Sequence, residues 1–546
     1  MYPSPIVSSQ PARESTPGIL DHAIAEWRSA LGPNAVITND SDLARAGLCT
    51  FAIRRTVPVI LKPADRAQVQ HVMRIATHYG VPVYPVGSGK NWGYGSGVPS
   101  VSGCALLDLS RMTRITDFSE ELAYVTVEPG VTQRQLMDFL TARQSTLWMD
   151  ATGASPDCSL IGNTLERGFG HTPYSDHFGH CGNLEVVLPS GECVHTGFGR
   201  IPGASTAPVY KYGVGPYIDG IFTQSNFGVV TSMTIWLMPA PEYMQAFFFR
   251  CDDEDGLTRL VDALRPLRLN GTLQSAVHIG NGYKVLSGLR QYPWELTGGK
   301  TPLQPDQLRQ LSQSMNFGYW NGSGALYGTK AQVAEARRML KKALKGNVTR
   351  VQFLDEGLLG VAARFAKPLG WLTGWDLSKT LELVKPLFGL LRGQPTAEPI
   401  KSAFWRKRTE GKADADPDTE GCGLLWCSHT APIRGEDARI MMEITERITL
   451  AHGFEPIVSI TLLTERTLCS VVSISYDRSI DGEDKRAQEC YHQLMAALLS
   501  AGYPPYRLGV QSGYSVPAEE GFRNLMQAIK DRIDPKNILA PSHYVR

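Results

Sequence analysis

The sequence predicts an α+β protein in which two large lobes share a cleft. A chain of 546 residues is too long for one ordinary hydrophobic core, since about 150 residues per domain corresponds to two to four units. Short apolar strand patterns interleave with helix patterns up to about residue 240, which indicates stacked layers of strands and helices. Longer helical patterns such as residues 331–344 follow from about residue 241. This change places a boundary between the lobes near residue 240.

The first clear unit is a helix, a strand and a glycine-rich loop. Asp65, followed three residues later by Gln68, signals a helix start, and Gly80 signals its end. One face of this helix carries the apolar residues Val69, Val72, Met73 and Ala76. An apolar run at 81–86 then predicts a strand, and GSGKNWGYGSG follows at 87–97.

Strand and helix signals alternate through the rest of this region. Thr132 with Gln135 opens a second capped helix. The other predicted elements are strands at 105–109 and 124–127, a hairpin of 184–188 with 192–196, and a β-branched strand that ends the segment 215–239. This alternation favours an α+β sandwich of layers over an all-α or all-β domain.

The composition is that of a globular protein and excludes several classes. Because 54 Lys and Arg balance 53 Asp and Glu, the charge gives no reason to expect a nucleic-acid partner. No run of about 18 uncharged apolar residues predicts a membrane span. Ten cysteines occur without C-x-x-C or Cys/His zinc spacing, so we expect no metal site, free thiols and a cytoplasmic location. The first 18 residues lack the pattern of a secretory signal and are expected to form a loose arm.

Two common phosphate-binding patterns do not fit the loop at 87–97. A Walker loop requires a glycine where Tyr84 stands and Ser or Thr where Asn91 stands. The dinucleotide fingerprint G-x-G-x-x-G fails because its third glycine comes one residue late, at Gly93. The glycines still allow consecutive backbone N–H groups to turn inward around an anion, with Lys90 available for added charge. The alternative interpretation is a tight turn without a ligand.

A second glycine-bearing segment, residues 155–172, strengthens the anion interpretation. It contains three glycines that allow close backbone approach and three neutral hydrogen-bonding side chains: Gly162, Gly168, Gly170, Ser155, Asn163 and Thr164. Two such loops in one layered domain suit a long ligand with a pyrophosphate and a flat ring system, as in a flavin dinucleotide.

Six stretches carry a resemblance to a known family. They are PVGSGKNWGYGSG (85–97), VTVEPGVTQRQL (125–136), IGNTLERGFGHTPYSDH (161–177), EVVLPSGE (185–192), GPYIDGIFTQSNFGVVT (215–231) and DPKNILAP (534–541). These stretches occur in the order and spacing of the vanillyl-alcohol oxidase and p-cresol methylhydroxylase family of FAD enzymes. The chain resembles this family over roughly residues 50–546, and most strongly through residue 240. The resemblance implies FAD held in a two-lobed, PCMH-type FAD-binding domain, with an inserted α+β cap domain over the flavin.

The resemblance also implies a division of the chain and a set of FAD-binding residues. The division is an N-terminal arm and helix at 1–49, the FAD-binding domain at 50–240, the cap domain at 241–500, and a tail at 501–546 that returns to the FAD domain. The implied FAD-binding residues are Pro85, Gly87, Ser88, Gly89, Lys90, Asn91, Gly95, Ser155, Gly162, Asn163, Glu166, Gly168, Gly170, His171, Gly228, Val229 and Val230.

Phenol oxidisers in this family bind the substrate as a phenolate and transfer a hydride from the para carbon to flavin N5, which leaves a quinone methide. Hydrogen-bond donors at the phenolate oxygen assist this step, because charge stabilised there favours departure of the hydride. Tyr94, Tyr506 and Arg507 match the two tyrosines and the arginine that serve this purpose in the family. For any one tyrosine the alternative is a packed ring with a solvated hydroxyl.

Other positions depart from the family pattern. His171 replaces a tyrosine beside the expected flavin ring, and residues 151–153 lack the acidic residue expected near N5. Asp150 and Asp157 are nearby in the sequence, but neither falls at the matching position. His171 is therefore the candidate proton acceptor, since a histidine pKa of roughly 6.5 suits transfer near neutrality. A structural histidine that bonds flavin or backbone is the equal alternative.

The position matching a family histidine that bonds FAD covalently falls near Leu424, which has no nucleophile. We therefore expect dissociable FAD, with linkage through Cys422, Cys427 or His429 as the alternative. A family histidine pair is replaced by Cys469-Ser470, which predicts a substrate other than a simple vanillyl compound.

Three questions about the function stay open at this point: the substrate, whether the chain is an enzyme, and the electron acceptor. The substrate is a para-substituted phenol, or a non-phenolic alcohol, amine or natural-product intermediate. The chain is an FAD-dependent oxidase or dehydrogenase, or a catalytically silent flavin-binding protein. Oxygen or a cytochrome accepts the electrons, and family analogy favours a homodimer or a larger assembly.

Overall fold

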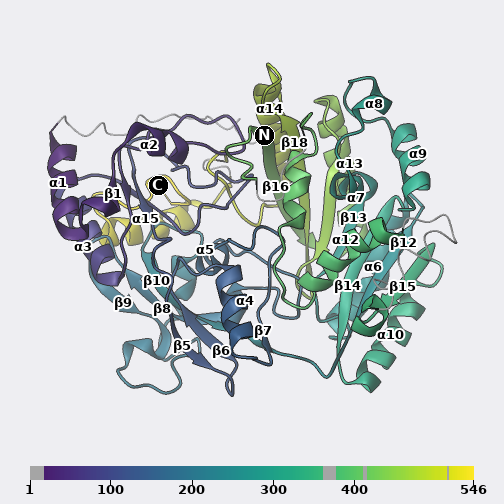
Figure 1. Cartoon of the computed structure of the whole chain (residues 1–546), viewed down its shortest axis with the longest axis horizontal. Coiled ribbons are helices and arrows are strands. Elements are labelled where there is room, and N and C mark those ends of the chain that lie inside the picture. The colour runs from purple at the N-terminus through teal and green to yellow at the C-terminus, as the bar shows by residue number, and fades with distance from the viewer. Residues whose placement is uncertain (1–17, 361–376, 410–414, 513–515, 546) are drawn as a thin grey trace.

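Two lobes lie side by side in the computed structural model, which describes residues 18–360, 377–409, 415–512 and 516–545 (Figure 1). The arm predicted before residue 18 lies outside the described residues. The first lobe holds two small sheets, and the second holds a seven-stranded sheet. Helices and strands occur in both lobes, as the predicted α+β class requires.

The first lobe contains a four-stranded and a five-stranded sheet, with a two-stranded ladder beside them. In spatial order the strands are β1 (Val36–Ile37), β2 (Ile60–Leu61), β4 (Ala105–Asp108) and β3 (Val83–Val86); then β5 (Ile115–Ser119), β6 (Tyr124–Val127), β10 (Val229–Trp236), β8 (Cys181–Val187) and β9 (Cys193–His195); then β11 (Met238–Pro239) and β7 (Leu147–Trp148). Strand β4 pairs in parallel with both β2 and β3. The antiparallel pair of β8 and β9 confirms the predicted hairpin.

Helix boundaries in this lobe follow from local capping. The helices are α1 (Ile19–Leu31), α2 (Asp40–Ala46), α3 (Arg66–Tyr79), α4 (Gln133–Ala142), α5 (Leu160–Leu165) and α15 (Glu520–Ile533). The Asp65 side chain accepts a hydrogen bond from the Gln68 backbone at the start of α3, and Gly80 ends it in a left-handed conformation. Thr132 forms a capping box at the start of α4. Both predicted helix starts are confirmed.

The second lobe is built on an antiparallel sheet with one face toward the first lobe. Its strands in spatial order are β15 (Arg350–Leu354), β12 (Tyr243–Cys251), β14 (Trp320–Gly328), β13 (Val277–Asn281), β17 (Ile457–Leu462), β18 (Thr467–Asp477) and β16 (Cys422–Pro432). Alternate residues of β16 and β18 point to opposite faces, so that Leu425 and Ile474 join the large hydrophobic core while Trp426 and Val471 face a cavity.

Helices cover the core face of this sheet. The helices of the lobe are α6 (Gly256–Leu269), α7 (Gly282–Leu289), α8 (Trp294–Thr297), α9 (Pro305–Met315), α10 (Lys330–Leu344), α12 (Leu377–Leu390), α13 (Gly435–Ala451) and α14 (Glu483–Ser500). Short 3₁₀ turns occur in both lobes. Those of the first lobe are η1 (Pro33–Ala35), η2 (Phe178–His180), η3 (Gly197–Arg200) and η4 (Asp219–Phe222), and η5 (Glu398–Phe404) belongs to the second. Helices α6, α10, α13 and α14 contribute the apolar side chains that pack on the sheet.

Backbone hydrogen bonds join the edge strand β16 to the first lobe. The Trp426 N–H donates to the Gly93 carbonyl at 3.1 Å, and the Leu424 N–H donates to the Thr50 carbonyl at 2.9 Å. Gly93 has a φ of +74°, and a Cβ on it would lie 1.9 Å from the Trp426 ring. A glycine at this position therefore allows the glycine loop to reach the edge strand.

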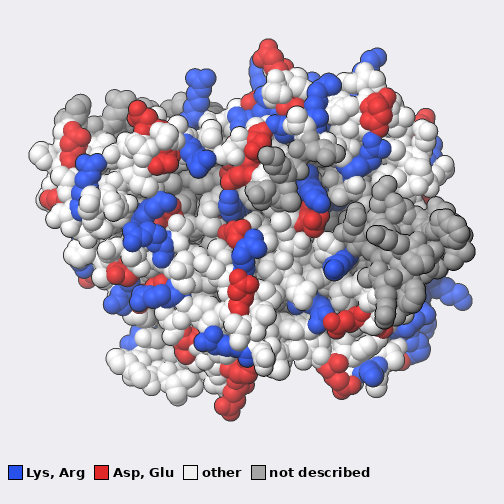
Figure 2. Space-filling view, in the orientation of Figure 1, with Lys and Arg blue, Asp and Glu red and all other residues white. Residues whose placement is uncertain are grey.

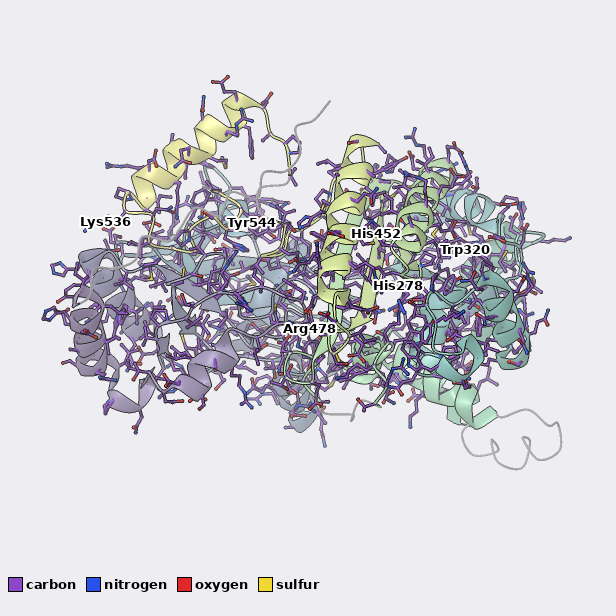
Figure 3. All side chains as sticks on the ribbon, turned by 90° about the horizontal axis from the view of Figure 1, so that it is seen from above. His278, Trp320, His452, Arg478, Lys536 and Tyr544 are labelled. Carbon is purple, nitrogen blue, oxygen red and sulfur yellow. The ribbon has the colours of Figure 1, made fainter. Side chains whose placement is uncertain are left out.

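The C-terminal tail returns to β3 of the first lobe. Val83 N–H donates to the Ile538 carbonyl and Val83 carbonyl accepts from Ala540 N–H, both at 2.8 Å. Helix α15 precedes this contact and lies on the outside of the lobe (Figure 3). The division near residues 240 and 500 stays a prediction.

Charges of both signs are interspersed on the face that Figure 2 shows. This mixture agrees with the formal charge of +1. Across the described ranges, every helix is too short or too polar to cross a bilayer.

A buried ion pair fixes the tail. Lys530 Nζ lies 2.7 Å from Asp534 Oδ2 and donates to the carbonyls of Asn226 at 2.9 Å and Leu539 at 3.0 Å. Both charged side chains are 1% exposed. Removing one partner leaves an uncompensated buried charge, which is costly.

We predict that Lys530→Met lowers the free energy of unfolding by about 3–5 kcal/mol, because Asp534 then remains buried without its cation. The control is Lys485→Met, whose side chain is 84% exposed and whose effect is expected to stay within about 0.5 kcal/mol. Urea denaturation followed by circular dichroism measures both. Equal midpoints for the two variants would contradict the assigned role of the pair.

Candidate active site

The turn after β3 presents unpaired backbone N–H groups to a cavity. From Gly87 to Asn91, these groups donate no hydrogen bond to any residue that the structure describes. A Cβ on Gly87 would lie 2.7 Å from Ser159 Cβ and Oγ, and Gly89 has a φ of +68°. Unpaired amides in a concave turn can donate hydrogen bonds to the oxygens of a phosphate.

Helix α5 forms the facing wall, and Ser159 holds it against the turn. The Ser159 N–H donates to Ser88 Oγ at 3.0 Å, and Ser159 Oγ accepts from the Gly162 N–H at 2.9 Å. After the helix, a Cβ on Gly168 would lie 2.2 Å from the Asn163 side-chain oxygen. Both walls therefore bring bare backbone to the cavity.

The cavity between the lobes has a volume of about 390 Å³, within the range of small-molecule sites. The predicted residues that line it are Pro85, Gly87, Ser88, Gly89, Lys90, Asn91, Tyr94, Gly162, Asn163, Glu166, Gly168, Gly228, Val229, Val230, Tyr506 and Arg507. Four predicted residues are not part of its lining: Gly95, Ser155, Gly170 and His171. Gly95 and Gly170 instead pack closely against Val510 and Asp150.

The charge of Lys90 has a different partner from the one the sequence suggests. Lys90 Nζ lies 2.7 Å from Asp416 Oδ2, and the Trp92 indole donates to the same carboxylate at 3.2 Å. Burial would raise the pKa of Asp416, but its bond to Lys90 lowers it. Lys90 therefore lines the cavity with its charge already paired, because Asp416 lies beside the glycine loop.

Tyr94, Tyr506 and Arg507 meet at the cavity wall, although the glycine loop and the tail supply them separately. The Arg507 guanidinium carbon lies 4.1 Å from the Tyr94 ring centroid. Tyr94 Oη donates to Ser428 Oγ at 2.9 Å. Burial raises the pKa of both tyrosines, against the opposing influence of the Arg507 charge. The two hydroxyls therefore stay protonated and remain available as donors.

Arg507 is balanced by an anion and an amide. Its Nη2 donates to Asn91 Oδ1 at 2.8 Å and lies 3.5 Å from Glu166 Oε2. Burial alone would raise the pKa of Glu166, but bonding to His543 and the charge of Arg507 lower it to about 2. Tyr544 Oη also donates to Glu166 at 2.7 Å. Glu166 and Arg507 thus both stay charged at neutral pH.

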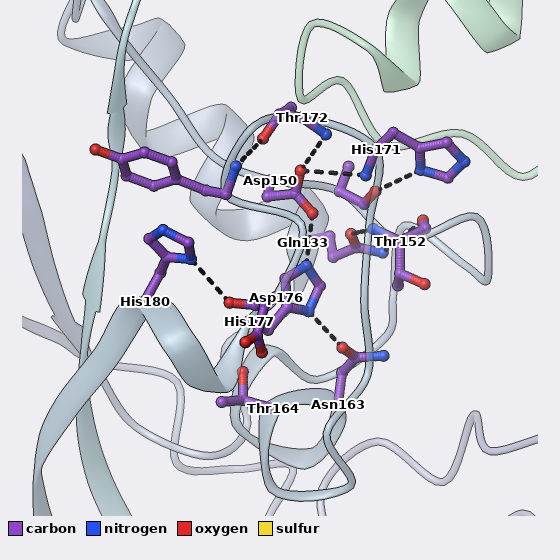
Figure 4. A network of polar contacts seen from close by, with 12 residues as sticks. Gln133, Asp150, Thr152, Asn163, Thr164, His171, Thr172, Asp176, His177 and His180 are labelled. Carbon is purple, nitrogen blue, oxygen red and sulfur yellow. Dashed lines mark hydrogen bonds and ion pairs between the residues drawn. The ribbon is translucent and has the colours of Figure 1, made fainter. Parts of the chain in front are cut away.

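A polar network positions the turn that carries His171 (Figure 4). Asp150 Oδ1 accepts from the N–H groups of His171 at 3.2 Å and Thr172 at 2.6 Å. Asp150 Oδ2 lies 2.7 Å from His177 Nε2, and His177 Nδ1 lies 2.6 Å from Asn163 Oδ1. Burial would raise the pKa of Asp150, but His177 and the Thr172 bonds lower it. The ionised carboxylate therefore links the histidine turn to the wall of the cavity.

His171 stands behind the cavity wall and touches the second lobe. Its Nδ1 lies 3.1 Å from the Ala151 carbonyl, an acceptor that places the proton on Nδ1 and leaves Nε2 as the basic nitrogen. Its ring centroid is 4.5 Å from that of His278. A Cβ on Gly153, which lines the cavity, would lie 3.6 Å from His171 Cε1. Burial lowers the pKa of His171, so the neutral ring prevails at pH 7.

The candidates for covalent attachment divide between the two faces of β16. Leu424, Trp426 and Ser428 line the cavity, whereas Cys427 and His429 point to the helix-covered core. There Cys427 Sγ lies 3.6 Å from His429 Nδ1, and burial lowers the pKa of His429 to about 3. Cys422 lies on the cavity side but packs with Leu424 outside the lining. This placement favours dissociable FAD.

Sequence reasoning missed Asp150, Trp426, Ser428 and His278. Asp150 was set aside because it does not match the acidic position of the family. The alternation of Leu424, Trp426 and Ser428 was a usable signal, since residues two apart on a strand share a face. No local signal identifies His278, whose importance comes from its contact with His171.

These features fit an FAD. The glycine turn offers a run of free amides for the diphosphate, and Gly87 and Gly168 sit where side chains would crowd it. Tyr94, Tyr506 and Arg507 line the same cavity together with Trp426 and Ser428 of the second lobe. Fold and site therefore fit a flavoprotein with two lobes that share one cavity.

Comparisons with known proteins give the family. The sequence signature described as "FAD binding domain" matches residues 57–197. The chain is 42% identical over 527 residues to 1'-carboxy-chondrochloren decarboxylase of Chondromyces crocatus, covering 96% of this chain and 97% of that protein. It is 29% identical over 533 residues to the 4-cresol dehydrogenase [hydroxylating] flavoprotein subunit of Pseudomonas putida, covering 96% and 95%.

A solved structure agrees with these relatives. The crystal structure of p-cresol methylhydroxylase with substrate bound superimposes with a TM-score of 0.87 at 27% identity, covering 98% of both chains. The chain belongs to the p-cresol methylhydroxylase and vanillyl-alcohol oxidase family. It is an FAD-dependent oxidoreductase, as the resemblance implied.

We predict that Gly87→Ala weakens FAD binding at least about tenfold, because its Cβ would force Ser159 and the facing wall away from the turn. Gly97→Ala is the control in the same loop, since a Cβ there meets nothing within 4 Å. Titration of the apoprotein with FAD, followed by quenching of flavin fluorescence, gives both dissociation constants. If both variants bind FAD like the parent chain, the turn does not cradle the cofactor.

Proposed function

We propose that the protein oxidises a para-substituted phenol at its benzylic carbon. The observation that carries this proposal is the convergence of Tyr94, Tyr506 and Arg507 at one cavity wall, where Tyr94 and Arg507 are buried and Tyr506 is partly buried. A guanidinium between phenolic donors suits a phenolate oxygen, because it stays charged and its donors are fixed in direction. The compound named in both relatives, 4-cresol (p-cresol), is a para-substituted phenol.

In this proposal Arg507 and the two tyrosines bind and polarise the substrate. Their donors stabilise negative charge on the phenolic oxygen, which assists loss of a hydride from the benzylic carbon. Bound FAD supplies the two-electron acceptor at this step. Glu166 and Asn91 hold Arg507 in position from behind. The oxidised substrate is a quinone methide, and exclusion of water by the second lobe governs whether it is hydrated.

His171 is proposed as the acceptor of a substrate proton. Residues 151–153 offer no carboxylate, and the Ala151 carbonyl leaves His171 Nε2 without a proton. Asp150 holds the backbone of His171, so its carboxylate is a positioning group here.

A second candidate reaction is oxidation coupled to loss of carbon dioxide from a natural-product intermediate. The relative at 42% identity is named as a decarboxylase. When the carboxylate on the carbon next to a quinone methide leaves as carbon dioxide, the bonding electron pair stays with the substrate and the ring returns to a phenolate, so the same clamp serves both reactions.

The acceptor of the flavin electrons, oxygen or a cytochrome, stays a prediction, as do the homodimer and the cytoplasmic location.

Tyr94→Phe and Tyr506→Phe should each slow substrate oxidation about 10²-fold, because each removes one donor from the phenolate oxygen. Tyr210→Phe is the control, since Tyr210 is 48% exposed and lies outside the cavity lining. Anaerobic mixing with 4-ethylphenol, followed at the flavin absorbance band, measures the rate of bleaching. Absence of bleaching by every 4-alkylphenol in the parent chain would refute phenol oxidation.

His171 predicts a specific pH dependence. Burial lowers its pKa, so the basic form is present at neutrality and the oxidation rate should fall only as pH drops below the usual histidine range near 6.5. In His171→Gln the rate should be lower at pH 7 and the acid limb should disappear. An unchanged acid limb in the variant would assign the proton transfer to another group and leave His171 a structural role.

A further inference from the structure

Lys284 carries a positive charge that no carboxylate balances among the residues that the structure describes. Among the described residues, Nζ has no carboxylate within ion-pair distance and no hydrogen-bond acceptor. Its side chain is only partly exposed. Charges removed from water are usually paired, so an unpaired ammonium in such a place is a site for an anion. Burial lowers the pKa of Lys284 to about 8, which leaves most of it protonated at pH 7.

The first turn of α7 holds Lys284 next to the cavity. Asn281 caps this helix by accepting from the Lys284 N–H at 3.0 Å. Nζ then lies 5.7 Å from the centroid of the Trp426 ring, which lines the cavity. The lysine stem packs beside Gly280, where a Cβ would lie 3.3 Å from Lys284 Cγ.

His278 supplies a second polar group beside Lys284. Its Nε2 is buried without a hydrogen-bond partner in the described part of the chain, and its Nδ1 lies 3.0 Å from Thr461 Oγ1. Burial, together with the charges of His171 and Lys284, lowers the pKa of His278, which places Lys284 within electrostatic reach. Figure 3 labels His278 in the lobe of the seven-stranded sheet.

The phenolate clamp and Lys284 lie across one sheet face. Ser428 on β16 aligns with Val471, Ser459 and Gly280 on the next three strands. Three strand spacings amount to about 14 Å, and the side chains of Trp426 and Lys284 extend into this interval. A para-substituted phenol with a short anionic side chain can therefore bridge the two sites.

We propose that Lys284, with His278, binds a carboxylate on the side chain of the phenolic substrate. The inference rests on the proposed phenol oxidation and names its substrate class: para-hydroxyphenyl compounds with a carboxylate on the carbon after the benzylic one. An oxidation of such a compound ends in decarboxylation, as the name of the 42% identical relative suggests.

The electron balance of that reaction closes. The benzylic C–H bond breaks and its hydrogen leaves with two electrons for the flavin oxidant, which leaves a quinone methide. The bond to the carboxylate carbon then breaks, and its electron pair forms the side-chain double bond as the ring returns to a phenolate. Thus 3-(4-hydroxyphenyl)propanoate gives 4-vinylphenol and carbon dioxide, and water is not consumed.

The test compares two substrates that differ by one carboxylate, 3-(4-hydroxyphenyl)propanoate and 4-ethylphenol, in the FAD-loaded protein. Lys284→Met should raise KM for the propanoate about 10- to 100-fold, the loss expected for one charged hydrogen bond. KM for 4-ethylphenol and the dissociation constant of FAD should change less than about threefold. Lys284→Arg, which keeps the charge, should stay within about fivefold of the parent chain for both substrates.

Each outcome has one meaning. Equal losses for both substrates, or weaker FAD binding, would place Lys284 at the flavin and overturn the carboxylate site. A parent chain that oxidises 4-ethylphenol but shows no preference for the propanoate would also overturn it, while leaving phenol oxidation intact. Bleaching with neither substrate would instead defeat the proposed function itself.

Discussion

The buried guanidinium of Arg507 is the charge on which the arrangement of the site depends. An ion removed from water must be compensated by nearby groups, or the fold loses several kcal/mol. Its compensation comes from Asn91 in the glycine loop and from Glu166 after α5, and Tyr544 of the tail holds Glu166 in turn. Three segments far apart in the chain are thereby brought to one point. The same charge polarises Tyr94, so structure and proposed chemistry share one cause.

The two lobes contribute different kinds of groups. The first lobe offers backbone, because glycines expose the amides from Gly87 to Asn91. The second lobe offers side chains from one sheet face, among them Trp426 and Ser428. The charges at their junction follow the same logic, since Lys90 is neutralised by Asp416 whereas Lys284 has no partner of its own in the described chain.

The departures from the family pattern form a connected set. His171 occupies a position where relatives carry tyrosine, and Asp150 secures its backbone through the network that includes His177. The ring of His171 then rests against His278 of the opposite lobe. A pair of neutral histidines thus lies where the two lobes touch at this point.

The sequence by itself determined the local structure and the cofactor. Asp65 and Gly80 delimit a helix because capping bonds span only a few residues, and the glycine spacing with the family resemblance identified FAD, Tyr94, Tyr506 and Arg507. Only the tertiary structure decided that Lys90 pairs with Asp416, that His429 faces away from the cavity, and that Lys284 meets no carboxylate in the part of the chain that the structure describes. Such partners are separated by long stretches of chain, and which side chains meet depends on strand register and on how the lobes pack. No pattern of neighbouring residues records that packing.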